Sequence, residues 1–270
     1  MSKFDITPES LSLESVHTPC LFNWKGKDAV LFIGTASHTL ARTEESYTLW
    51  LWMDGEEPKP VFDYGDSVCA PWFVKHGKGL RLYACIRIGK VYRLAVFYGD
   101  SPDNWVFIDW CLPETEQWQW TPCVLKTDIG FRLFYCSINT RGIALLKQAI
   151  SDDGVHFYND NYFTVPTPAG FYGQVKPALY KVSDTDYALF LSEYYNDCVA
   201  LNLYKTQDLE TFELVGRVFP ERNDIYKAHL YKGALIYVSS TNGLGSISAK
   251  HILLNEYVND WLPYPVPVVL

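Results

Sequence analysis

Two lysines occupy equivalent places in segments 51 residues apart: Lys176 in GQVKPALY and Lys227 in IYKAHLYK. An ammonium group binds a carboxylate or phosphate through charge-assisted hydrogen bonds, and two such groups close together favour an anionic ligand where water is excluded. Arg87 and Arg141 follow apolar runs, and we expect them to join the lysines from loops. The alternative is that both lysines extend their charges into bulk solvent.

Aromatic side chains lie close to the same segments. Trp120 precedes a proline by two residues, Tyr172 lies directly before the segment of Lys176, and Tyr226 directly precedes Lys227. The face of an aromatic ring can stack on a sugar ring, so these three residues are candidates for substrate binding. The alternative is that they fill the protein core, which is the commoner fate of an aromatic side chain.

Few carboxylates accompany these cations. Glu193 in LSEYYND follows an apolar strand, where partial burial would raise its pKa towards that of a general acid, and Asp66 is its best partner. Glycoside hydrolysis usually needs two carboxyl groups. His17 is the candidate to replace a missing acid, because imidazole titrates near neutral pH. The alternative for Glu193 is an ordinary loop carboxylate paired with Lys176. The alternative for His17 is a histidine that is hydrogen-bonded within its strand.

A repeat of about fifty residues positions all these residues. Pro19, Pro71, Pro122 and Pro177 follow short β-type runs, Ala228 takes the fifth place, and the separations are 52, 51, 55 and 51 residues. Three further short strands follow each proline, which is the pattern of a propeller blade. We therefore predict an all-β, five-bladed β-propeller forming one domain over residues 1–270, with four antiparallel strands per blade. The predicted blades span about 14–62, 66–107, 117–158, 172–215 and 224–261.

The innermost strand of each blade lines the channel of a propeller. The start of that strand and the end of its antiparallel neighbour lie on the same face of the ring. The candidate residues fall at these two places in the repeat, so we expect them to gather at one mouth of the channel. An irregular β-sandwich with prolines aligned by chance is the alternative.

The chain resembles the five-bladed glycosidases of glycoside hydrolase families 43 and 32. The matching pieces are the proline-bearing strands, SDDGVHF at 151–157 and TQDLETF at 206–212. The resemblance implies a sugar substrate and carboxylates just before the first, third and fourth prolines. Here those places hold Thr18, Thr121 and Lys176, with Val175 two residues before Pro177. The resemblance therefore supports the fold, whereas the carboxylates that carry the family's mechanism are not in place.

Three functions remain open. The leading hypothesis is a carbohydrate-active enzyme that acts on a sugar or a related small substrate, anionic ones included, with non-standard catalytic residues. The first alternative is a non-catalytic propeller that binds a glycan or a small anion. The second is a biosynthetic enzyme outside glycan chemistry that reuses the propeller, because fold alone does not decide function.

Composition excludes several other classes. The formal net charge of −8 argues against a nucleic-acid partner, which would need a basic stripe. Seven cysteines, none in a metal-binding CxxC pair, predict no metal site and buried thiols in a reducing compartment. The N-terminus has no apolar signal segment and no run is long enough to span a membrane, so we expect a cytoplasmic protein. No nucleotide-binding motif is present, and we predict no cofactor.

Overall fold

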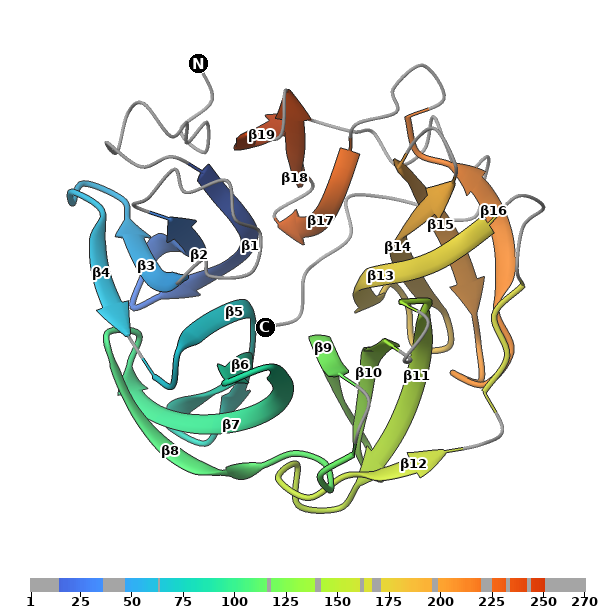
Figure 1. Cartoon of the computed structure of the whole chain (residues 1–270), viewed down its shortest axis with the longest axis horizontal. Coiled ribbons are helices and arrows are strands. Elements are labelled where there is room, and N and C mark those ends of the chain that lie inside the picture. The colour runs from blue at the N-terminus through green and yellow to red at the C-terminus, as the bar shows by residue number, and fades with distance from the viewer. Residues whose placement is uncertain are drawn as a thin grey trace.

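A computed structural model describes residues 15–35, 47–62, 64–115, 118–138, 142–160, 163–166, 171–195, 199–219, 225–231, 234–241 and 244–250. Within these ranges every regular element is a β-strand, which confirms the all-β prediction. Hydrogen bonds join the strands into four sheets, one of which contains eight strands, and we describe them as five groups arranged around a common centre (Figure 1).

The strands are listed here by group, from the innermost outwards. The first group contains β1 (Ser15–Trp24), β2 (Lys27–Thr35), β3 (Thr48–Met53) and β4 (Lys59–Phe62). The second contains β5 (Ser67–His76), β6 (Gly79–Ile88), β7 (Val91–Ser101) and β8 (Asn104–Trp110). The third contains β9 (Trp118–Thr127), β10 (Gly130–Ile138), β11 (Ala144–Ser151) and β12 (Tyr158–Asp160).

The fourth group contains β13 (Phe171–Lys181), β14 (Tyr187–Tyr195), β15 (Val199–Thr206) and β16 (Glu213–Arg217). The described strands of the fifth are β17 (Ile225–Tyr231), β18 (Ala234–Thr241) and β19 (Leu244–Lys250). Neighbouring strands within each group are antiparallel, and one parallel bridge between Ala144 and Gly173 joins the third group to the fourth. The remainder of the predicted fifth blade, residues 251–261, lies outside the described residues.

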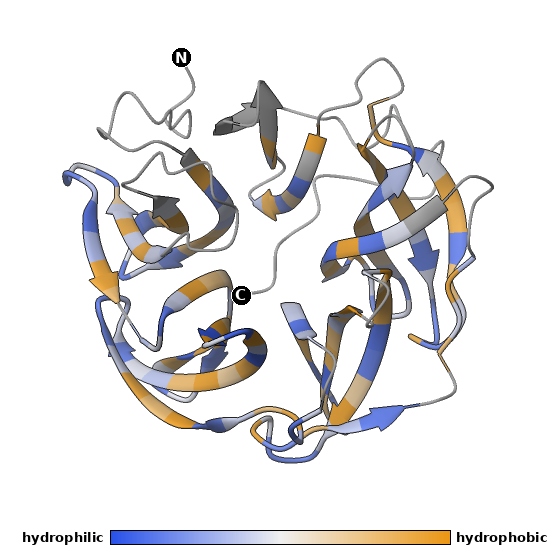
Figure 2. Cartoon of the chain, in the orientation of Figure 1, coloured by the Kyte–Doolittle hydropathy of each residue, from blue (hydrophilic) through white to orange (hydrophobic). Residues whose placement is uncertain are grey.

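Burial follows the position of a strand within its group. The first eight residues of β6 are all buried, because both faces of this inner strand pack against neighbours. The outer strand β8 exposes every second residue of its first half, as expected for a strand with one face in water. Hydrophobic residues accordingly recur along the strands of each group in Figure 2. One large core of buried side chains runs through all five groups.

Each innermost strand carries a β-bulge at the proline position of the repeat. The register shifts between His17 and Cys20 in β1, and at the corresponding place in β5, β9, β13 and β17. Proline cannot donate to the ladder, so a bulge is where a sheet tolerates it. The residue before each proline has a positive φ: 47° at Thr18, 50° at Ala70, 49° at Thr121 and 56° at Lys176. This backbone is strained for a β-branched residue such as threonine, and such strain concentrates at functional sites.

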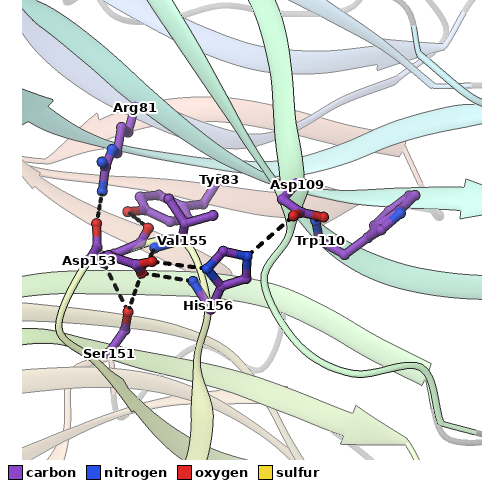
Figure 3. A network of polar contacts seen from close by, with 9 residues as sticks. Arg81, Tyr83, Asp109, Trp110, Ser151, Asp153, Val155 and His156 are labelled. Atoms are coloured by element: carbon purple, nitrogen blue, oxygen red, sulfur yellow. Dashed lines mark hydrogen bonds and ion pairs between the residues drawn. The ribbon is translucent and has the colours of Figure 1, made fainter.

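The SDDGVHF segment is a turn that fastens two blades together (Figure 3). The Oδ1 atom of Asp153 accepts hydrogen bonds from the backbone amides of Val155 and His156, at 2.7 and 2.9 Å. The guanidinium of Arg81 on β6 donates to the Asp153 carbonyl, and the Tyr83 hydroxyl donates to the carbonyl of Gly154 at 2.7 Å. In TQDLETF, Asp208 accepts from two backbone amides in the same way. The residues of these two motifs, which carry the family resemblance, therefore have a structural role as turns within the blades.

Candidate functional site

Lys227 is a lysine buried inside the channel wall. Its side chain on β17 is completely shielded from solvent, and its Nζ atom lies 5.4 Å from the centroid of the Trp72 ring on β5. Within the described part of the chain, this Nζ has no hydrogen-bond partner. Burial lowers the pKa of the ammonium, partly offset by the nearby thiols of Cys20 and Cys123.

Lys176 occupies the bulge of the neighbouring blade and lies close to Lys227. Its backbone amide donates to the Thr121 hydroxyl at 3.2 Å, which ties the bulge of β13 to that of β9. The residue is partly exposed, whereas its ammonium lies deep enough for burial, reinforced by the charge of Lys227, to lower its pKa to about 8. The structure thus brings together the two lysines that the repeat placed in equivalent positions.

His17 joins the same group from β1. Burial and the positive charge of Lys176 lower the pKa of its imidazole to about 3. The ring is therefore neutral at physiological pH and carries no proton that it could release as a general acid. Its predicted role as a substitute acid remains a prediction, which this low pKa disfavours.

Three buried polar atoms near the bulges have no partner among the described residues. They are the hydroxyl of Thr18, the indole Nε1 of Trp120 and the Nζ of Lys227. The three residues come from different strands and lie one or two positions before the proline site. Leaving a buried donor or acceptor unpaired costs about 1–3 kcal/mol, so each of the three atoms is a candidate contact for a polar ligand.

Aromatic side chains form a second part of the site. The Tyr92 ring lies 5.0 Å from that of Trp118 and 6.0 Å from that of Trp120, measured between centroids. Arg87 is hydrogen-bonded to the Tyr92 hydroxyl, so this predicted binding residue lies beside Trp120. Trp118 is 40% exposed and presents ring surface to solvent. Trp120 also packs against a small cluster of Cys136, Ala144 and Val175, and Val175 precedes Lys176 in sequence, so the aromatic part lies near the cationic part.

The two candidate carboxylates are held in separate networks. Glu193 is completely buried and accepts from Gln174 at 3.1 Å, Tyr204 at 2.6 Å and Tyr195 at 3.0 Å, as well as from Asn202. Asp66 is exposed and accepts from the backbone amide of Gly89 in the β6–β7 turn.

The fully engaged Glu193 acts in this structure as a buried hydrogen-bond acceptor, and its catalytic role remains a prediction. The same holds for Asp66.

Some candidate residues cannot be placed. Arg141 and the side chains of Tyr172 and Tyr226 lie outside the described residues. Sequence reasoning missed Tyr92, which contacts Trp118 and Trp120. It also missed Trp72, which lies beside the ammonium of Lys227. Trp72 directly follows Pro71, one of the repeat prolines, and this position was the signal in the sequence that could have found it.

Other classes of site find little support in the described ranges. They contain no cluster of three side chains able to hold a metal ion and no helix long and apolar enough to cross a membrane. The six described cysteines are free and buried, as expected from their apolar neighbours. Burial raises the pKa of the Cys20 and Cys123 thiols to about 12, so both are protonated and unreactive.

Comparisons with known proteins agree on the fold. An endo-arabinase from Bacteroides thetaiotaomicron superposes with a TM-score of 0.67 at 12% identity, covering 93% of this chain and 98% of that one. A thermostable family-43 glycoside hydrolase gives 0.63 at 11% identity, over 87% and 88% of the two chains. This chain has the propeller fold of those glycosidases.

A third similar structure comes from glycoside hydrolase family 130, described as mannoside phosphorylases that include hydrolases targeting β-1,2 mannosidic linkages in Candida mannan. Its TM-score is 0.62 at 11% identity, over 92% of this chain and 89% of that one. No family profile matches the sequence, and no curated protein is similar to it in sequence. At such identities the likeness concerns the fold alone.

Proposed function

We propose that this chain binds a small anionic carbohydrate at the channel mouth where the innermost strands begin. The observation that carries the proposal is the buried Nζ of Lys227, which has no hydrogen-bond partner among the described residues and lies beside Lys176. A buried cation needs a counter-charge, and a ligand carboxylate or phosphate supplies it.

The rest of the site fits the sugar part of such a ligand. Trp118 offers an exposed ring face for stacking, and the unpaired Nε1 of Trp120 is a donor for a sugar hydroxyl. The Thr18 hydroxyl can donate or accept. Charge, ring face and hydrogen-bonding groups together match a sugar acid or a sugar phosphate better than a neutral sugar.

Hydrolysis by a pair of carboxylates fits this geometry less well. Such a reaction passes through an oxocarbenium-like transition state, whose positive charge two nearby ammonium groups would destabilise. Glu193 already receives four side-chain hydrogen bonds and is shielded from solvent. We therefore place binding of an anion ahead of hydrolysis.

Calorimetric titration tests this proposal with glucuronate and glucose 1-phosphate as anionic probes and glucose as the neutral one. Lys227→Met and Lys176→Gln should each weaken binding of the anions roughly tenfold to a hundredfold, since a hydrogen bond to a charged group contributes about 1.5–3 kcal/mol. Lys147→Gln is the matched control, because Lys147 is an exposed lysine on β11. Anion binding that survives both site substitutions, or glucose binding as tightly as the anions, contradicts the proposal.

A second candidate function is phosphorolysis of a glycosidic bond. It is favoured by cations at a position where the family's hydrolases would hold a carboxylate, and by the fold shared with family 130. The bond from the anomeric carbon to the leaving oxygen would break, a phosphate oxygen would bond to that carbon, and the leaving oxygen would take a proton from the Lys176 ammonium. Incubation with β-mannobiose and inorganic phosphate should then release a sugar 1-phosphate, and release of mannose without phosphate incorporation contradicts it.

A further inference from the structure

A cavity lies beside the C-terminal ends of three innermost strands. Its volume is about 510 Å³, and it is lined by the ends of β5, β9 and β13 together with Leu21 of β1 and His229 of β17. The lining residues of β5, β9 and β13 lie towards the C-terminal ends of these innermost strands, whereas Lys176 lies in the middle of β13. Lys176 and Lys181 are five residues apart on β13, which corresponds to about 16 Å along a strand.

Lysines recur at the rim of this cavity with the period of the repeat. Lys75, Lys126 and Lys181 each lie four residues after the proline of their blade, and all three line the cavity. Lys232 occupies the same place in the fifth repeat and lies outside the described residues.

The three described rim lysines are exposed, and none forms an ion pair within the described ranges. Asp128 is the one carboxylate among the residues that line the cavity. The rim therefore carries an excess of positive charge on a protein whose net charge is negative.

The floor of the cavity is aromatic and held in place by hydrogen bonds. The rings of Trp72, Tyr180 and His229 lie 5.4 to 5.9 Å apart, measured between centroids. The Trp72 indole donates to the Val124 carbonyl at 2.9 Å, and the Tyr180 hydroxyl accepts from the Leu230 amide at 3.1 Å. The three side chains are fixed and only 4 to 8% exposed, so small parts of their rings border the cavity, without further loss of side-chain freedom on binding.

His229 adds a hydrogen-bond acceptor. Its Nε2 lies 3.1 Å from the carbonyl oxygen of Leu21, so Nε2 carries the proton and donates it. Burial and the charge of Lys227 lower the pKa of the ring to about 3, which keeps it neutral. The Nδ1 atom is therefore an acceptor, and it has no partner among the described residues. Its complement is a donor such as a hydroxyl group.

We propose that this cavity is a second binding site, for a phosphate monoester of a sugar, with the phosphate at Lys75, Lys126 and Lys181 and the sugar over Trp72, Tyr180 and His229. Each part of that ligand is chemically complementary to one feature of the cavity. The dianionic phosphate matches the three rim cations, the sugar ring matches the aromatic floor, and a hydroxyl matches the Nδ1 acceptor.

The test is calorimetric titration of the full chain at low salt with glucose 6-phosphate, beside glucose and inorganic phosphate. Glucose 6-phosphate should bind more tightly than either fragment. Lys126→Gln and Lys181→Gln should each weaken it roughly two- to fivefold, and the triple variant with Lys75→Gln at least about tenfold, because these cations are exposed. Lys78→Gln, which changes an exposed lysine in the β5–β6 turn outside the cavity lining, is the matched control.

Lys176→Gln separates this site from the one under the proposed function. If the second site is real, Lys176→Gln leaves a glucose 6-phosphate binding event that still depends on Lys126 and Lys181. The inference is overturned if the triple variant binds like the wild type, if Lys176→Gln removes all binding, or if no binding occurs at millimolar ligand. Nitrogen NMR checks the floor, since ligand binding should shift the Nδ1 resonance of His229. An unchanged resonance with lysine-dependent binding contradicts the contact to His229.

Discussion

The ammonium of Lys227 on β17 lies 5.4 Å from the centroid of the Trp72 ring on β5. The two residues belong to the innermost strands of different blades. Lys227 belongs to the proposed anion site, while Trp72 lines the cavity beside the C-terminal ends of β5, β9 and β13. A cation over an aromatic face is attracted by the ring quadrupole, which offsets part of the cost of burying this charge.

Lys227→Met should stabilise the protein while removing anion binding. The substitution replaces a buried ammonium that has no hydrogen-bond partner among the described residues with an apolar chain of similar length, so the free energy of unfolding should rise by about 1 kcal/mol or more. Urea denaturation at neutral pH measures this change, with Lys147→Met on the exposed face of β11 as control. A loss of stability would mean that Lys227 makes a favourable interaction in the folded protein.

Anion binding should weaken as the pH rises through about 8. Lys176 has its pKa lowered to about 8 by burial and by Lys227, so it loses its charge in this range. Calorimetry with glucuronate from pH 6.5 to 9.5 measures the effect, and Lys176→Gln should remove this pH dependence. An unaltered dependence in the variant would assign the titration to another group.

The same shift predicts how the stability contributed by Lys176 varies with pH. The folded pKa lies below the value of an unfolded lysine, so between about pH 8 and the unfolded pKa near 10.4 the unfolded chain binds a proton that the folded chain has released. The free energy of unfolding should therefore rise with pH across this window, relative to Lys176→Gln. The difference between the two proteins in urea titrations, measured at several pH values, gives the sign.

Glu193→Gln should cost stability. The carboxylate accepts from four side chains, including Tyr204 at 2.6 Å, and the amide of glutamine would place a donor against other donors. We expect a loss of about 1–3 kcal/mol in the free energy of unfolding, measured by chemical denaturation. Asp66→Asn, on an exposed carboxylate, should change stability little. If Glu193→Gln instead abolishes a turnover while leaving stability intact, Glu193 is catalytic.

The contact between the 151–157 turn of the third blade and Asp109 of the second blade should weaken as the pH rises. Hydrogen bonds to Asp153 at 2.9 Å and to Asp109 at 3.2 Å raise the pKa of His156. The contribution of His156 to stability is thus fully present below its unfolded pKa and is lost as the pH rises through the raised folded value. Hydrogen exchange of the 151–157 turn from pH 5.5 to 8.5 should report faster opening at the higher pH. His156→Gln should flatten this trend, and a trend that persists in the variant would place its origin elsewhere.

The regular spacing of Pro19, Pro71, Pro122 and Pro177 was enough to predict the propeller, because a repeat in sequence requires a repeat in structure. The same spacing predicted that Lys176 and Lys227 share a site, since equivalent positions in adjacent blades face the same channel. The apolar neighbours of the cysteines likewise indicated buried thiols. These features depend on local or periodic patterns of residues, and patterns of both kinds can be recognised in the sequence alone.

Tertiary packing decided the rest. The ring of Trp72 under Lys227, three of the four donors around Glu193 and the carbonyl of Leu21 that fixes the tautomer of His229 come from residues on different strands. The order of residues sets which side of a strand each one occupies. Which side chains then meet across the channel, and which are shut off from water, depends on how the blades close around their centre, and no local pattern encodes that distance.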